Sequence, residues 1–197
     1  MNTKVTTYSA MNLKNQLLIA MPSLNGSNFH QAVAYICEHN DKGAMGIVIN
    51  KPSPMALGEI LKQLNIEYNN EQIGNFPVLS GGPVAQEQGF LIHQGKLNKE
   101  NSKETLVDKE RNITISASKD ILREFAQGEG PENLLVSLGY AGWGSGQLEY
   151  ELKDNRWLLA PVNLDILFNV PYTERWKMAA ASIGVNFDCM SIEAGHA

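Results

Sequence analysis

One segment restricts the backbone more than any other part of this 197-residue chain: GYAGWGSGQLEYE, residues 139–151. It places Gly139, Gly142, Gly144 and Gly146 within eight positions. Glycine loses more conformational entropy on folding than any other residue, so this density indicates positive φ angles or a close approach to the main chain. The preceding apolar run, NLLVSLGYA (133–141), is typical of a strand that is covered on both faces. We therefore predict a strand that ends in a glycine loop.

The segments before this strand alternate between strand and helix patterns. AVAYICEH (32–39) and AMGIVIN (44–50) flank the turn NDKG and predict an antiparallel hairpin. Leu57, Ile60, Leu61 and Leu64 have helical spacing, which predicts a helix with Ser53 as N-cap and Pro54 at its first position. The polar stretch 96–111 reads as an exposed connection.

The later segments continue this alternation. NITISAS (112–118) leads into a helix that begins at Ser118, and QLEYELKDN (147–155) predicts a further helix, although its alternation would also suit a strand. RWLLAPV (156–162) is a strand pattern, and a last helix is predicted from Tyr172 to Gly184. We expect one α/β unit over residues 11–197, a mixed β-sheet with flanking helices and room for a small subdomain. Residues 1–10 are polar and are expected to form a disordered extension.

Charge and composition exclude several functions. The net charge of -5 and the lack of a basic stripe argue against direct nucleic-acid binding, which depends on Lys and Arg neutralising phosphates. No run approaches the roughly 20 apolar residues of a membrane span, so we expect a cytoplasmic protein. Cys37 and Cys189 are 152 positions apart, and the four histidines lack zinc-site spacing. We expect no disulfide, metal or cofactor.

The glycine segment is the first candidate site. Main-chain N–H groups in such a loop could bind an anion. The segment has no lysine, so it lacks the phosphate-loop signature. It also lacks the nucleophile-elbow signature, because Trp143 and Gln147 stand at the positions around Ser145 where an elbow has glycines. A structural turn, with Trp143 as a lid or core plug, is the reading we favour. The candidate ligand-binding residues are Gly142, Trp143, Gly144, Ser145, Gly146 and Gln147.

The second candidate is CEHN, residues 37–40. On a regular strand Cys37 and His39 share a face, so the imidazole could lower the pKa of the thiol and create a nucleophile or redox sensor. A free cysteine is more often simply buried, and Asn40, which is also a candidate ligand-binding residue, can shape the hairpin turn instead. The third candidate is SGGPV (80–84) with His93 downstream. Gly81 and Gly82 could form an anion-binding nest, or a tight turn alone, which we favour.

The motifs AMPSL, YICEHNDKGAMGIVINKP, SGGPV, GFLIH, LGYAGWGSGQLEYEL, WLLAPV and the terminal GHA occur in this order. Together they resemble the YqgE/AlgH family of bacterial proteins, also called UPF0301, from about Met11 to Ala197. The resemblance implies an α/β fold around a mixed sheet and supplies no cofactor. One branch of that family is named for an association with transcription regulation in alginate production.

Two functions remain open at this point. The weak catalytic signals favour a non-enzymatic regulatory or interaction module with an unknown protein or small-molecule partner, linked to transcription regulation at most indirectly. The alternative is an enzyme or redox-responsive protein that uses Cys37 and His39, with main-chain N–H groups of the glycine segments binding an anion. Convergence of CEHN, SGGPV and GYAGWGSGQ around one recess would indicate a shared site.

Overall fold

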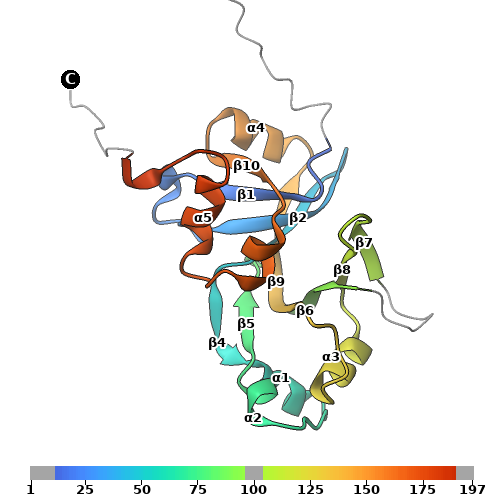
Figure 1. The fold of residues 1–197 in the computed structure, drawn as a ribbon. Coiled ribbons are helices and arrows are strands. Elements are labelled where there is room, and N and C mark those ends of the chain that lie inside the picture. Colours follow the sequence, from blue (N-terminus) through green and yellow to red (C-terminus); the bar gives the residue numbers. More distant parts are fainter. Residues whose placement is uncertain (1–11, 96–103, 190–197) are drawn as a thin grey trace, which may run out of the picture.

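The computed structural model describes residues 12–95 and 104–189, and it shows the α/β fold that the sequence predicts (Figure 1). The strands are β1 (Gln16–Ala20), β2 (Val33–Asn40), β3 (Gly43–Val48), β4 (Pro52–Ala56), β5 (Pro77–Ser80), β6 (Val84–Gln94), β7 (Glu104–Asp108), β8 (Ile113–Ser116), β9 (Leu134–Gly144) and β10 (Trp157–Pro161). The helical segments are η2 (Pro22–Leu24), α1 (Leu57–Gln63), α2 (Glu71–Gly74), α3 (Lys119–Ala126), α4 (Gln147–Lys153), η3 (Asp165–Asn169), α5 (Arg175–Ala181) and η4 (Phe187–Cys189). The expected extension at residues 1–10 lies outside the described residues.

Within the described residues the strands form one sheet of ten, in the order β10-β1-β2-β3-β9-β6-β8-β7, with β5 on β9 and β4 on β5. The sheet is mixed, because β5 runs parallel to β9 while β3 and β6 run antiparallel to it. The predicted hairpin is confirmed: Asn40 pairs with Gly43 across the turn between β2 and β3. Strand β9 is therefore the central strand, bordered by β3 and β5 on one edge and by β6 on the other.

Both faces of the sheet are covered. Under α5 and η3, apolar residues of β1, β2 and β3 such as Ile19, Tyr35 and Ile47 are fully buried. The opposite face of the same strands packs against α4, whose Leu148 and Leu152 are buried. A third apolar cluster lies between α1, α3 and the lower half of the sheet (Figure 1). This arrangement confirms the prediction that residues 133–141 form a strand covered on both faces.

Two of the helix predictions are confirmed and one is wrong in its start. Ser118 is the N-cap of α3, and its hydroxyl accepts a hydrogen bond from the Asp120 N–H. QLEYELKDN forms α4. Ser53 and Pro54, however, belong to β4, which pairs with β5, so α1 begins only after Ala56. Pairing of Pro52 and Ala56 with β5, on either side of these residues, keeps the segment extended before the helix can start.

The exposed connection predicted at 96–111 is wrong in its second half. Residues 104–108 form β7, which pairs with β8, and Val107 and Asp108 are buried. Burial pushes the pKa of Asp108 up, but hydrogen bonds from Arg111, Asn15 and Glu110 outweigh it and hold the pKa below 3.8. Asn15 also accepts a hydrogen bond from the Tyr35 hydroxyl, so the start of β1 is tied to the end of β7. Residues 96–103 lie outside the described part of the chain.

The connection between β5 and β6 crosses over β9. Val136 of β9 pairs with Val78 of β5 and with Leu91 of β6, so these two strands lie on opposite edges of β9. Residues 81–83 alone link them. The link passes so close to β9 that a methyl group on Gly82 would overlap the Tyr140 carbonyl. The SGGPV motif is thus the point where one chain segment crosses another.

Candidate functional site

The glycines around this crossing fall into two groups. Gly139 has a φ of 72°, and a Cβ there would lie 2.7 Å from the Gly82 carbonyl oxygen. Gly146 has a φ of 71° and is the N-cap of α4. These positions require glycine because of backbone conformation or crowding. Gly142 and Gly144 have no positive φ, and a Cβ at either would meet other atoms only at 3.4 Å or beyond.

The predicted glycine loop is largely a strand. β9 continues to Gly144, and its pairing with β3 runs from Ala141 to Gly144. Only Ser145 and Gly146 form a turn before α4. The Ser145 hydroxyl donates to the Asp41 carbonyl at 2.6 Å, and the Gly144 N–H donates to Gln147 Oε1 at 2.9 Å. Pairing with β3 prolongs the strand beyond the point where glycine content suggested its end.

Trp143 is a core plug and not a lid. Its ring packs near Phe29 and Trp157 on the α4 side of the sheet, and 5% of the residue is exposed. The indole N–H groups of Trp143 and Trp157 both donate to Glu151 Oε2, at 3.0 and 2.8 Å. The Trp143 side chain is therefore held on the face opposite Met45 and Gly142, and only its main chain is available as a ligand contact.

The structure separates Cys37 from His39, contrary to the expectation of a shared face. A β-bulge interrupts the pairing of β2 with β3 between Ile36 and Glu38, and this shifts the alternation by one residue. Cys37 is fully buried in the apolar cluster under α5, and burial raises the pKa of its thiol. His39 lies toward α4, where Nδ1 accepts from the Leu13 N–H and Nε2 bonds Glu149 Oε1 at 3.0 Å. The imidazole orders neighbouring segments and does not face the thiol.

The SGGPV segment does not offer a complete main-chain nest. The Gly81 N–H donates to the Leu138 carbonyl at 2.8 Å, so it is already used. A Cβ on Gly81 would overlap the Ser137 hydroxyl, so this glycine serves the chain crossing. His93 is fully buried in β6, where it pairs with Leu134 and Thr114, at the far end of β9 from Gly142. The structure does not bring His93 to the other candidates.

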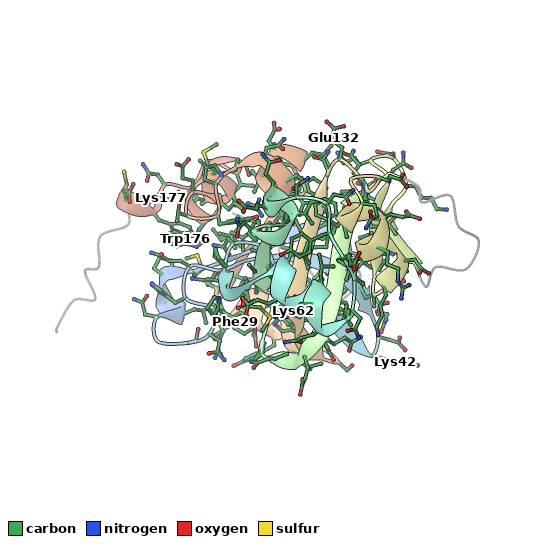
Figure 2. The ribbon with its side chains drawn as sticks, turned by 90° about the horizontal axis from the view of Figure 1, so that it is seen from below. Phe29, Lys42, Lys62, Glu132, Trp176 and Lys177 are labelled. Carbon is green, nitrogen blue, oxygen red and sulfur yellow. The ribbon has the colours of Figure 1, made fainter. Side chains whose placement is uncertain are left out.

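Parts of two of the three motifs nevertheless meet at one recess of about 430 Å³, which we call the β9 groove. Its lining residues are Glu38, Asn40, Lys42, Gly43, Ala44, Met45, Tyr140, Gly142 and Trp143. CEHN contributes Glu38 and Asn40, and the glycine segment contributes Tyr140 and Gly142. SGGPV borders the groove through Val84, whose side chain would lie 3.9 Å from a Cβ on Gly142. Lys42 lies at the periphery of the molecule, at the tip of the hairpin (Figure 2).

Most of the side chains that line the β9 groove are not predicted as site residues from the sequence. Glu38, Lys42, Met45 and Tyr140 were not among the candidates, although the hairpin register predicts that alternate residues of β2 and β3 share a face. Regular alternation does not predict this face for Glu38, because the bulge after Ile36 moves Glu38 to the same face as Met45. The groove has one exposed carboxylate, one exposed ammonium group and an apolar floor, with bare main chain at Gly142.

A second cavity of about 440 Å³ lies between α1, α3 and β6. Its lining is mostly aliphatic, including Ile60, Leu122 and Leu138, and none of the candidate site residues named from the sequence lines it. One wall is a bulge of β6: Val84 pairs with Tyr140 and Gly89 with Leu138, so the residues between them leave the ladder. No sequence pattern distinguished this bulge from a regular strand.

Comparison with known proteins fixes the family. A sequence model described as AlgH-like matches residues 17–188. The chain belongs to the AlgH-like family. A UPF0301 protein of Thioalkalivibrio sulfidiphilus is 45% identical over 189 residues, which cover 96% of this chain and 99% of that relative. A UPF0301 protein of Coxiella burnetii is 46% identical over 185 residues, with 94% and 97% covered.

Two solved structures extend the comparison. The solution structure of AlgH from Pseudomonas aeruginosa matches all of both chains with a TM-score of 0.74 and 42% identity. A crystal structure from Corynebacterium diphtheriae has a TM-score of 0.66 at 18% identity and covers 89% of this chain and 92% of its own, which shows a shared fold. The family resemblance read from the motifs is thus confirmed, and these AlgH-like relatives carry no stated activity in their names.

In the described residues no helix is long and apolar enough to cross a membrane. Residues 12–95 and 104–189 also contain no group of three or more His, Cys, Asp or Glu side chains placed to hold a metal ion.

Proposed function

We propose that this AlgH-like protein is a non-enzymatic interaction module and that the β9 groove is its recognition surface. The observation that carries the proposal is Gly142. This residue lies within a regular strand, its φ is not positive, and a Cβ would meet the Tyr140 ring at 3.4 Å and Val84 at 3.9 Å. The fold therefore leaves room for a methyl group at the floor of the groove, and the chain has none there.

A glycine within a strand is a cost to folding. Relative to alanine it destabilises a strand by roughly 0.5–1 kcal/mol, and it often marks a place where a ligand or another backbone comes close. Gly81, Gly82 and Gly139 are explained by the chain crossing, but Gly142 is not. Access to the main chain at the groove gives a reason for glycine at this position.

The groove supports binding better than catalysis. Cys37 is fully buried in the core, and burial raises the pKa of its thiol. His39 lies on the opposite face of the sheet, where its imidazole makes two hydrogen bonds. The thiol–imidazole pair of the alternative function therefore lacks its geometric basis. Glu38 and Lys42 at the groove are exposed and suit recognition of a polar partner.

A protein or a small molecule is the expected partner. The net charge of -5 disfavours the phosphate contacts on which nucleic-acid affinity depends. Any part that the protein plays in transcription regulation would then pass through such a partner and not through direct contact with DNA.

The test is affinity capture with three proteins: the wild type, Gly142→Leu and Gly89→Leu. Gly89 is a matched control, because it is also an exposed strand glycine without positive φ, and no atom lies within 4 Å of its Cβ position. Lysates of a bacterium that encodes the protein are crosslinked, and the recovered proteins and small molecules are quantified by mass spectrometry. We expect a partner that the wild type and Gly89→Leu retain and Gly142→Leu loses. Equal recovery by all three proteins would exclude the groove as the recognition surface.

A further inference from the structure

We infer that the partner presents an extended peptide segment, which adds as a strand to the free edge of β9 at Gly142–Gly144. This inference rests on the proposed function, because it names the class of partner that the β9 groove takes. It is carried by the direction of main-chain hydrogen-bonding groups and by the shape of the groove beside them.

The edge itself is open. On one side, β9 pairs with β3 from Ala141 to Gly144. On the other side, β6 pairs with β9 only as far as Val84, which faces Tyr140, and then turns into the crossing at Gly82 and Pro83. Within residues 12–95 and 104–189, no strand continues along this edge beyond Tyr140. Gly142 and Gly144 are both exposed.

Two contacts show which groups face that edge. A methyl group on Gly43 of β3 would overlap the Trp143 carbonyl, so this carbonyl points toward β3. The Gly144 N–H donates to the Gln147 side chain and not to β3. Alternate residues of a strand direct their N–H and C=O groups to the same edge. The N–H and C=O groups of Gly142 therefore point to the open edge, where an extended backbone can pair with them.

The Gln147 side-chain oxygen occupies the position that a main-chain carbonyl of an added strand would take. Its Oε1 accepts from the Gly144 N–H at 2.9 Å, and its Nε2 donates to Glu151 Oε1 at 2.9 Å. A side-chain amide thus satisfies a donor that a neighbouring strand would otherwise pair with. Because Gln147 is exposed, a peptide carbonyl can displace it without opening the core.

The groove explains why a peptide fits here better than an isolated anion. Edge pairing uses donors and acceptors together, which matches a peptide backbone. A side chain of the added strand opposite Gly142 can reach across it to Met45, because Gly142 pairs with Met45 and presents no side chain of its own. Val84, which is 38% exposed, and Tyr140 extend this apolar surface, and Glu38 and Lys42 offer both charges beside it. We therefore expect a peptide with an apolar residue at the position opposite Gly142.

The experiment uses random linear peptides displayed on phage. Peptides are selected on the full-length wild-type protein and counter-selected against Gly142→Leu, so that those retained bind at the groove. A bound peptide is then resynthesised with a single N-methyl group at each position in turn, and the affinities are measured by calorimetry. In parallel, hydrogen exchange of the Gly142 amide is followed by NMR.

Strand addition predicts a period of two. N-methylation at positions that face β9 should weaken binding by at least about tenfold, since each removes a hydrogen bond, while the alternate positions should change little. The peptide should also slow exchange of the Gly142 amide. Failure to recover any peptide, a scan without the period of two, or unchanged exchange of the Gly142 amide would each overturn the inference. The lysate comparison would still test the groove, because it does not require an extended peptide.

Discussion

Gly82 lies directly against the Tyr140 carbonyl, where the link from β5 to β6 crosses over β9. This contact explains two glycine motifs that are far apart in the sequence. SGGPV supplies the crossing segment, and Gly139 lies beneath it with a positive φ and no room for a Cβ. The crossing segment immediately precedes Val84, where β6 starts to pair with β9 at Tyr140, so β6 does not extend along the edge at Gly142. The same feature that constrains the fold thus exposes the proposed recognition surface.

Gly82→Ala should be severely destabilising. The methyl group would overlap backbone atoms of Tyr140 and Ala141, and the φ of 153° at this position also disfavours any L side chain. We expect a loss of at least about 3 kcal/mol in the free energy of unfolding, or no folded protein. Urea denaturation followed by tryptophan fluorescence measures it. Gly89→Ala, made in open space, should be as stable as the wild type or up to about 1 kcal/mol more stable; equal losses in both variants would argue against the crossing.

Asp108→Asn should weaken the tie between β1 and β7. The carboxylate accepts hydrogen bonds from the Asn15 side chain, the Arg111 guanidinium and two main-chain N–H groups. We expect a loss of about 2 kcal/mol near neutral pH, because the replacement amide cannot serve all these donors. Asp120→Asn breaks an exposed ion pair with Arg123 and should change stability little.

The effect of Asp108→Asn should depend on pH. The folded-state pKa of Asp108 lies below the ordinary value of 3.8, so the carboxylate stabilises the fold fully above pH 3.8. That contribution disappears as the pH falls through the folded-state pKa. The difference in unfolding free energy between wild type and variant should therefore shrink below pH 3.8. A difference that grows with acidification would contradict the hydrogen-bonded carboxylate.

Cys37 should be inert in the folded protein. It is fully buried and burial raises the pKa of its thiol, whereas Cys189 is exposed. The thiolate is the reactive form, so iodoacetamide near neutral pH should modify Cys189 and spare Cys37 until the protein is unfolded. Peptide mass spectrometry distinguishes the two sites. Modification of native Cys37 as fast as Cys189 would restore the thiol-based alternative.

Glu151→Ala should destabilise the α4 side of the sheet. The carboxylate accepts from the indole N–H groups of Trp143 and Trp157, and both residues are buried. Removing it leaves two donors without their acceptor, which we expect to cost about 2–3 kcal/mol in thermal or urea unfolding. Glu151→Gln keeps one carbonyl oxygen and should lose less. If the two variants lost the same amount, Trp143 would not depend on this acceptor.

Much of the fold was readable from local pattern. The β2–β3 hairpin, the N-cap at Ser118 and the covered strand at 133–141 depend on neighbours in sequence, and all are as predicted. The start of α1 and the strand β7 were predicted wrongly, because pairing with β5 and β8 decides them. Non-local hydrogen bonds override local preference at these two places.

The candidate site was harder to predict for the same reason. A β-bulge after Ile36 places Cys37 and His39 on opposite faces of the sheet, and no residue type in CEHN indicates that a bulge is present. The glycine content indicates that another group approaches the main chain closely, but it does not indicate whether that group belongs to the protein itself or to a ligand. At Gly82 it is the protein's own β9, whereas at Gly142 the nearest described atoms, in the Tyr140 ring and Val84, leave room for a methyl group.

The free energy of unfolding of Gly142→Ala tests the central claim most directly, namely that glycine at this position serves access to the main chain and not folding. The added methyl group has room and the strand gains a better residue than glycine. We therefore predict that urea denaturation shows stability equal to the wild type or up to about 1 kcal/mol higher. A loss of more than about 1 kcal/mol would mean that the fold itself requires Gly142, and the argument for the β9 groove would fail.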